Sequence, residues 1–194
     1  MKNLKPRTVL FRRKREQKTD YKNRLKLLLS KQLRLVVRFT NSGIIVQVVE
    51  FQMQGDKVLM ALDSSALKKM GWNYSQKNFP ATYLMGLLLG KKAQQKGIKQ
   101  AILDPGTKAP LKKSKVYALL KGAIDGGLAV PHGDKDIFPN EDHLSGKHVS
   151  DYAHSLKGKK EYEARFSGYL KSKHAPEDIT KSFTEIKHKI LALK

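Results

Sequence analysis

The stretch "LRLVVRFTNSGIIVQVVEF", residues 33–51, repeats its apolar side chains with the period of two that is typical of β-strands. Leu35 and Val37 fall on one face of the first strand, whereas Arg34 and Arg38 fall on the opposite face. The pattern therefore predicts a strand with one core-facing side and one basic side.

A turn and two further strands follow this first strand. Asn41, Ser42 and Gly43 are typical residues of a hairpin turn, and "IIVQVVEF" after them repeats the strand pattern. A second turn at residues 54–56 leads to "KVLMAL", residues 57–62. Because strands joined by short turns run in opposite directions, we expect an antiparallel three-stranded meander.

Farther along the chain, the apolar period becomes that of a helix. Pro80 suits a first helical turn, and Gly97 suits a C-terminal cap. "QAILDPG", residues 100–106, then predicts a buried strand, and a second helix is expected over residues 114–125. A strand-helix-strand unit beside the meander predicts a mixed sheet covered by helices, the α/β (α+β) class.

The first helix has a small-residue pair, Gly86 and Gly90, which predicts close packing on the sheet. The longest apolar run, residues 83–89, is far shorter than the ~18–20 residues of a membrane-spanning helix, and the basic N-terminus has no apolar signal core. The absence of cysteine excludes disulfides and thiolate metal sites and fits a reducing compartment. We therefore expect a cytoplasmic protein with no membrane partner.

The chain is strongly basic, with 39 Lys and Arg against 17 Asp and Glu and a net charge of +22 over 194 residues. Residues 1–31 hold 12 basic and 2 acidic residues, residues 32–131 hold 15 and 5, and residues 132–194 hold 12 and 10. We interpret these parts as a basic N-terminal arm with a helix, a central α/β RNA-binding domain, and a linker with a helical C-terminal extension. The charge favours a polyanion as partner, nucleic acid before an anionic membrane surface.

The arm combines dense charge with one short helix. Thr19 or Asp20 can cap it. A predicted core-facing stripe follows the cap: Tyr21, Leu25, Leu28 and Leu29. Lys22 and Lys26 repel each other one turn apart, so phosphates would stabilise this helix. Five of the eight arginines of the chain lie in the arm, and their planar forks suit phosphates and base edges: Arg7, Arg12, Arg13, Arg15 and Arg24. A solvated or disordered basic tail is the alternative.

The C-terminal third begins with "VPHGDKDIFPNEDHL", residues 130–144, which has turn residues and little periodicity and predicts a linker or an extended surface segment. Amphipathic helices are expected at about residues 146–156, 159–170 and 176–193. We expect these helices to dock on the main domain or on a partner.

No residue pattern indicates catalysis. The histidines at positions 143, 148 and 154 lack the HExxH arrangement of a zinc site, and "GTKAPLKKSK" lacks the spacing of a phosphate-binding nucleotide loop. Acidic residues 134–142 indicate a solvated loop. We therefore predict no catalytic residue, metal, cofactor or small-molecule substrate. An RNA-processing or modifying enzyme and a general nucleic-acid-binding protein remain the alternatives to a specific RNA-binding protein.

Five segments, in order and spacing, resemble one known family: "FRRKREQKTDYKNRLKLL", "LRLVVRFTNSGIIVQVV", "FPATYLMGLLLGKKA", "LKGAIDGGLAVPH" and "HVSDYAHSL". It is the archaeal and eukaryotic branch of the large-subunit ribosomal protein family L eighteen, called L five in eukaryotes. The resemblance covers nearly the whole chain. It implies a structural protein that binds 5S ribosomal RNA and helps attach it, with 23S-type ribosomal RNA and neighbouring ribosomal proteins, to the central protuberance of the large subunit.

The resemblance also implies which residues contact RNA. They lie in the arm, on the first strand and its turn, around the second helix, and after the "GGLAVP" turn: Arg12, Arg13, Lys14, Arg15, Lys18, Tyr21, Arg34, Arg38, Asn41, Lys113, Lys115, Lys121 and His132. The charge pattern of the arm adds three more residues to this set: Arg7, Lys22 and Arg24. Tyr21 or Trp72 could stack on an unpaired base or pack in the core. The loop "LDPGTKAPLKKSK" departs from the family by its proline and extra lysines, which leaves its contacts open.

Overall fold

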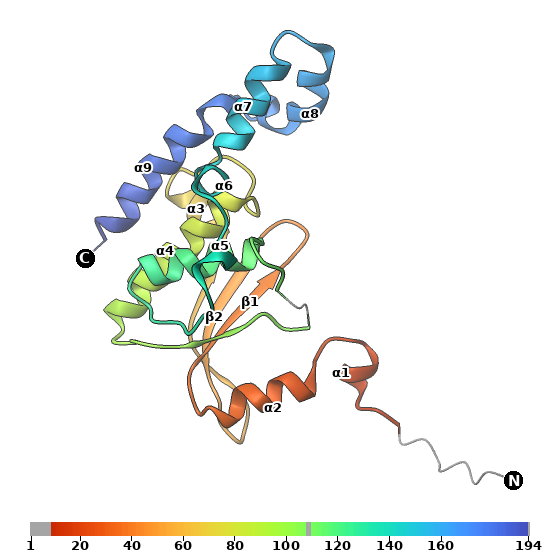
Figure 1. Ribbon diagram of the computed structural model, residues 1–194, viewed down its shortest axis with the longest axis vertical. Coiled ribbons are helices and arrows are strands. Elements are labelled where there is room, and N and C mark those ends of the chain that lie inside the picture. Colours follow the sequence, from red (N-terminus) through yellow and green to blue (C-terminus); the bar gives the residue numbers. More distant parts are fainter. Residues whose placement is uncertain (1–8, 108–109, 194) are drawn as a thin grey trace, which may run out of the picture.

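The computed structural model describes residues 9–107 and 110–193, so Arg7 of the predicted RNA-binding set lies outside the described residues. A four-stranded sheet in the order β3-β2-β1-β4 forms the centre of the molecule (Figure 1). Its strands are β1 (Arg34–Phe39), β2 (Ile44–Glu50), β3 (Lys57–Asp63) and β4 (Ile102–Asp104). β1, β2 and β3 pair antiparallel, and β4 pairs parallel with β1, so the predicted meander and mixed sheet are confirmed.

One face of the sheet carries the main hydrophobic core, as the alternating pattern predicts. Leu35, Val46 and Val48 are fully buried on this face. The opposite face of β1 is also covered, since Arg34 is only 2% exposed and Val36 only 8% exposed. The basic side that the pattern predicts for β1 does not face solvent at Arg34, because the carboxylates of Asp56 and Asp104 and the surrounding residues enclose its guanidinium group.

Two long helices, α4 (Phe79–Gln95) and α5 (Lys115–Asp125), lie on the core face (Figure 1). The Asn78 side chain caps α4 by accepting a 2.9 Å hydrogen bond from the backbone N–H of Ala81. The two helices cross at small residues: a Cβ at Gly86 would overlap the carbonyl oxygen of Leu119. One at Gly90 would lie 2.8 Å from the Cα of Gly126. The predicted close packing is thus present, but against α5 and not against the sheet.

The arm contains two helices, α1 (Arg12–Arg15) and α2 (Tyr21–Leu29), and α2 lies near the end of the sheet where β1 begins (Figure 1). Asp20 caps α2, accepting a 3.1 Å hydrogen bond from the backbone N–H of Asn23. The predicted core-facing stripe is wrong, because Leu25 is 60% exposed and Leu29 is 72% exposed. An ion pair between Arg24 of α2 and Asp56 joins α2 to the sheet, and the leucines of α2 lie outside the core.

The C-terminal third contains the predicted helices. They are α7 (Lys147–Leu156), α8 (Lys160–Lys171) and α9 (Ile179–Leu191), the last preceded by the 3₁₀ turn η2 (Pro176–Asp178). The sequence pattern does not predict the short helix α6 (Glu141–Ser145), which comes before them. The apolar side of α9 docks on α4 and joins the main core, with Phe183 5.7 Å from the ring of Tyr83. α7 and α8 enclose a second, small cluster around Phe166. The boundaries predicted at residues 31 and 131 remain a prediction.

Two connecting segments are more ordered than their sequence patterns indicate. Residues 130–144 hold the 3₁₀ turn η1 (Lys135–Ile137) and the start of α6, and Ile137 and Leu144 are buried. Ile137 and Leu144 therefore anchor this segment on the core, while most of its other described side chains are exposed, as expected of a surface segment. The short helix α3 (Ser65–Lys69) precedes Trp72, which is fully buried, and its indole N–H donates a 3.0 Å hydrogen bond to the Ser75 carbonyl. Trp72 therefore packs in the core and is not available to stack on an unpaired base.

Candidate nucleic-acid interface

A buried ion-pair network links the sheet to the arm. Arg34 places its Nη1 3.1 Å from Oδ2 of Asp104 and its Nη2 2.6 Å from Oδ2 of Asp56. The second contact is an ion pair and not a well-aligned hydrogen bond, and the Nε of Arg34 has no acceptor among residues 9–107 and 110–193. Arg24 on α2 reaches both oxygens of Asp56 at 2.9 Å. Asp56, in the turn between β2 and β3, therefore holds one arginine of the arm and one of the sheet.

Arg38 lies four residues after Arg34 on β1. It belongs to the same network but remains partly exposed. It donates 2.9 Å to the backbone carbonyl of Asp104 and lies 3.3 Å from its carboxylate. Its side chain is 44% exposed, against 2% for Arg34. Of the two predicted strand arginines, Arg38 is therefore the one that can reach a ligand from this position, whereas the donors of Arg34 already face carboxylates.

Asp56 makes the network sensitive to acid. Burial opposes its ionisation, but the attraction of the Arg34 and Arg24 guanidinium groups outweighs burial and holds the pKa of Asp56 below its ordinary value of 3.8. A lowered native pKa adds stability that is fully present above the unfolded pKa and is lost as the pH falls through the native pKa. We expect the free energy of unfolding to fall below about pH 4.

Urea unfolding of the parent chain and of Asp56→Asn, measured from pH 7 down to pH 2, tests this expectation. The difference in stability between the two proteins should shrink as Asp56 becomes protonated, because the variant lacks the titrating group. A difference that stays constant over this range would show that Asp56 does not contribute to the acid response.

The helix α1 presents four consecutive basic residues, and all of its side chains are exposed. Arg12 and Lys18 each lie 2.8 Å from the carboxylate of Glu16, and hydrogen bonds first to Lys18 and then to Arg12 lower the pKa of Glu16. Arg13 donates a 2.8 Å hydrogen bond to the hydroxyl of Thr19. Lys14 and Arg15 make no ion pair within the described chain, so α1 keeps most of its positive charge available.

The arm and the loop after β4 enclose two adjoining hollows, which we call the arm groove. The first has a volume of about 120 Å³ and lies between α1, α2 and the sheet. The second, about 430 Å³, lies between α2 and the loop residues Pro105, Gly106, Thr107 and Pro110. Together they gather six basic side chains: Arg13, Lys18, Lys22, Arg24, Lys26 and Arg38. Charges spaced along a groove in this way suit the phosphates of a nucleic-acid backbone.

The remaining predicted residues lie outside the arm groove. Lys113 pairs with Asp136 at 3.3 Å, and Lys115 lies over the ring of Phe79, 5.9 Å from its centroid. Asn41 lies in the β1–β2 turn. Lys121 and His132 are brought together, but in a different cavity beside α5.

Tyr21 lies at the start of α2, where its ring packs 5.5 Å from that of Phe11 and remains 37% exposed. It is therefore not a core residue, and it presents an aromatic surface on the arm. An exposed ring beside basic residues is a feature of surfaces that bind unpaired bases.

Sequence reasoning missed two groups of residues. Asp56 and Asp104 orient the arginines, but single acidic residues in turns and strand ends give no signal before the chain is folded. From the sequence, Lys26 is recognised only as a residue that repels Lys22. The spacing of one helical turn between the two lysines is the signal that both line the same hollow. Thr107 lines both hollows from the loop whose contacts the sequence left open.

The described residues contain no group of three or more His, Cys, Asp or Glu side chains that could hold a metal ion. The rings of His143 and His148 do lie 4.7 Å apart, beside Phe79. Within the same part of the chain, no helix is long and apolar enough to cross a membrane.

Comparison with known proteins agrees with this geometry. A family model described as "Ribosomal large subunit proteins 60S L5, and 50S L18" matches residues 6–100, which include the arm, the sheet strands β1 to β3 and α4. The large ribosomal subunit protein uL18 of Methanothermobacter thermautotrophicus is 44% identical over 182 residues, covering 94% of each chain. The protein of the same name from Methanococcus maripaludis is 45% identical over 186 residues, covering 95% of this chain and 96% of that one.

These identities extend through the C-terminal helices, beyond the part that the family model matches. They confirm the resemblance seen in the five sequence segments. The chain therefore belongs to the family of large-subunit ribosomal proteins that includes 60S L5 and 50S L18.

Proposed function

We propose that the chain binds 5S ribosomal RNA through the arm groove and attaches it to the large-subunit RNA at the central protuberance. Membership of a large-subunit ribosomal protein family makes the chain a structural constituent of the ribosome and not an enzyme, and it works in the cytoplasm. Ribosomal RNA and neighbouring ribosomal proteins are its partners. The observation that carries the finer proposal is the convergence of six basic side chains in one groove.

The positions of the predicted RNA-binding residues support different roles for them. The first hollow is lined by Arg13 and Lys18 of the arm and by Arg38 of the sheet. A ligand bound there can contact the arm and the sheet together. Arg12, Lys14 and Arg15 extend the charge along α1, and Tyr21 offers a ring for an unpaired base. Phosphates bound here would hold α1 and α2 against the sheet in the orientation that Arg24 and Asp56 already set.

The salt dependence of binding tests the arm groove. Each neutralised phosphate contributes about 0.7 to 0.9 to the slope of log affinity against log salt. We expect the double variant Arg13→Ala/Lys18→Ala to bind 5S ribosomal RNA more weakly and to reduce the magnitude of that slope by about 1.5. The measurement is a binding titration at several salt concentrations, with an unrelated structured RNA of equal length in parallel.

The matched control is Lys159→Ala/Lys160→Ala, which removes two exposed lysines at the start of α8, outside the arm groove. Its slope should equal that of the parent chain. An equal reduction in both double variants would show that only the net charge matters. Equal affinity of the parent chain for the two RNAs would contradict specific recognition of 5S ribosomal RNA.

A further inference from the structure

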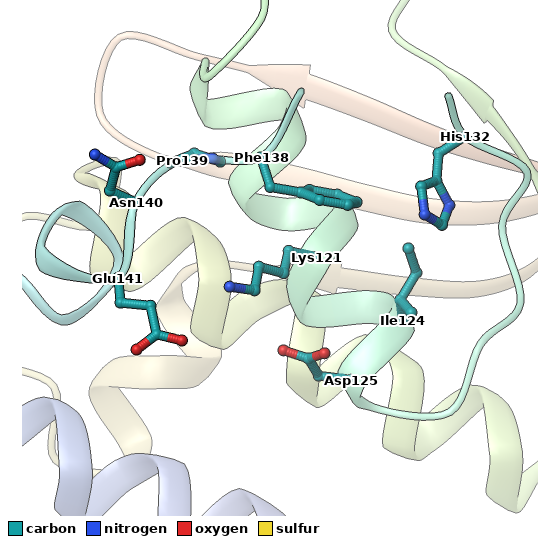
Figure 2. Close-up of a pocket in the computed structure, with 8 residues that line it drawn as sticks. All are labelled: Lys121, Ile124, Asp125, His132, Phe138, Pro139, Asn140 and Glu141. Carbon is teal, nitrogen blue, oxygen red and sulfur yellow. The ribbon is translucent and has the colours of Figure 1, made fainter. Parts of the chain in front are cut away.

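A second cavity, of about 580 Å³, lies beside the C-terminal half of α5 and under residues 132–141 (Figure 2). This volume falls within the range of about 300–1,000 Å³ that is typical of pockets for small molecules. Six of its lining residues are polar or aromatic: Lys121, Asp125, His132, Phe138, Asn140 and Glu141. We call this cavity the α5 pocket.

The aromatic wall of the α5 pocket is held in place by the packed segment that contains it. The buried side chain of Ile137 and the buried Pro139 anchor the chain on either side of Phe138. Nδ1 of His132 lies 2.9 Å from the carbonyl oxygen of Val130, to which it donates, and the imidazole ring meets Phe138 edge-on at 5.1 Å. Phe138 is thus a supported, partly exposed ring that a planar ligand can stack on.

Three polar side chains of the α5 pocket have no partner within the part of the chain that the structure describes. Lys121 and Glu141 make neither a hydrogen bond nor an ion pair there, and Asn140 begins α6 without a side-chain cap. Asp125 accepts one 2.8 Å hydrogen bond from the hydroxyl of Tyr83 and keeps its other oxygen free of one. Figure 2 shows the Lys121 side chain extending between Phe138 on one side and Asp125 and Glu141 on the other.

We propose that the α5 pocket binds one unpaired guanine of ribosomal RNA. The proposal rests on the RNA-binding function proposed above, and it adds a second site with a stated base preference. Guanine presents an acceptor, O6, next to two donors, N1–H and the 2-amino group. The Lys121 ammonium matches O6, as lysine does in base recognition, and the Glu141 or Asp125 carboxylate matches the two donors. Stacking on Phe138 supplies the remaining contact.

The same lining disfavours the other candidates. Adenine and cytosine have one amino donor beside a ring acceptor, and uracil has one donor between two acceptors, so none can satisfy a carboxylate with two donors. An arginine from a neighbouring protein would suit the carboxylates and the ring, but it has no acceptor for the Lys121 ammonium, whereas guanine offers O6. The phosphates of a bound nucleotide lie on the side away from the base edge, and hence away from Glu141.

Nucleotide titrations of the full chain test the proposal, followed through the backbone amide signals of Ile124 and Asn140 by nuclear magnetic resonance. We expect guanosine monophosphate to bind about tenfold more tightly than adenosine, cytidine or uridine monophosphate. Inosine monophosphate keeps O6 and N1–H but lacks the 2-amino group, so its affinity should fall between these. Glu141→Gln and Lys121→Met should each weaken guanosine monophosphate binding about tenfold.

Glu161→Gln is the matched control, because Glu161 is also an exposed glutamate in the first turn of a helix, α8, away from the α5 pocket. It should leave guanosine monophosphate binding unchanged. Equal shifts with all four nucleotides, an absence of shifts at millimolar concentration, or tighter binding of N-acetylarginine amide would each overturn the proposal. The last outcome would assign the pocket to a protein partner.

Failure of this proposal is distinguishable from failure of the proposed function. The Arg13→Ala/Lys18→Ala variant changes the arm groove and leaves the α5 pocket intact. If that variant loses 5S ribosomal RNA while guanosine monophosphate shows no preference over the other nucleotides, the pocket fails and the arm groove stands. If the guanine preference holds but the variant binds RNA normally, the pocket stands and the arm groove fails.

Discussion

Gly122→Ala is expected to lower the free energy of unfolding by about 3 kcal/mol, the upper part of the range for overpacking a dense core. In α5, a Cβ at this position would overlap the carbonyl oxygen of Tyr83 and lie 2.9 Å from the backbone nitrogen of Leu87. Both neighbours are main-chain atoms of α4, so no rotamer change can make room. α4 and α5 would have to separate, which opens the core that covers the sheet. Urea unfolding measures the loss.

Gly168→Ala is the control for this prediction. Gly168 also lies within a helix, α8, but a Cβ there would have no heavy atom within 4 Å. Alanine is the better helix former, so the control should gain up to about 1 kcal/mol. A loss in the control as large as that of Gly122→Ala would show that the effect does not come from the contact between α4 and α5.

Local sequence patterns predicted the elements of this fold well. The alternation around Val37, the turn at Gly43 and the helix signals at Pro80 and Gly97 each depend on residues that are neighbours in the chain. Gly97 has a φ of 72°, which is the left-handed conformation that the predicted cap requires. These features are local, so the sequence alone was sufficient to locate them.

Features that depend on contacts between distant residues were harder to predict. The pair of Gly86 and Gly90 indicated a close approach, but the sequence did not say that Leu119, Ala123 and Gly126 would be the partners. The stripe through Leu25 predicted burial of α2, but in the structure that side stays exposed and α2 meets the sheet through the ion pair between Arg24 and Asp56. In both cases a periodic pattern gave the face of a helix but not the element that the face meets.

For the candidate site too, local features could be predicted from the sequence and contacts between distant residues could not. The arm was recognisable because charge density is a property of the sequence, and the structure gathers Arg13, Lys18 and Arg38 where the arm meets β1. The α5 pocket was not, because its charged residues come from positions 121, 125 and 141 in segments that showed no common motif. Lys121 and His132 were predicted to contact RNA only because of the family resemblance.

Asp104→Asn should lower the free energy of unfolding by about 3 kcal/mol, at the low end of the cost of breaking a buried ion pair. Arg34 is 2% exposed and would keep its charge, while the new amide would turn a donor or an uncharged oxygen toward it. Asp56 remains beside Arg34, which is why the larger values in this range are not expected. Arg38 would also lose its carboxylate partner. Urea unfolding at neutral pH measures the difference.

Asp151→Asn, on the exposed side of α7, is the matched control and should change stability by less than about 0.5 kcal/mol. A second variant separates a lost attraction from a stranded charge. If the loss comes from leaving Arg34 buried without enough counter-charge, adding Arg34→Met to Asp104→Asn should restore much of the stability, because an apolar side chain needs no partner. If the double variant is less stable than either single one, the ion pair itself stabilises the sheet. The arm would then be fixed to β1 through Asp56 and Arg24 before any RNA binds.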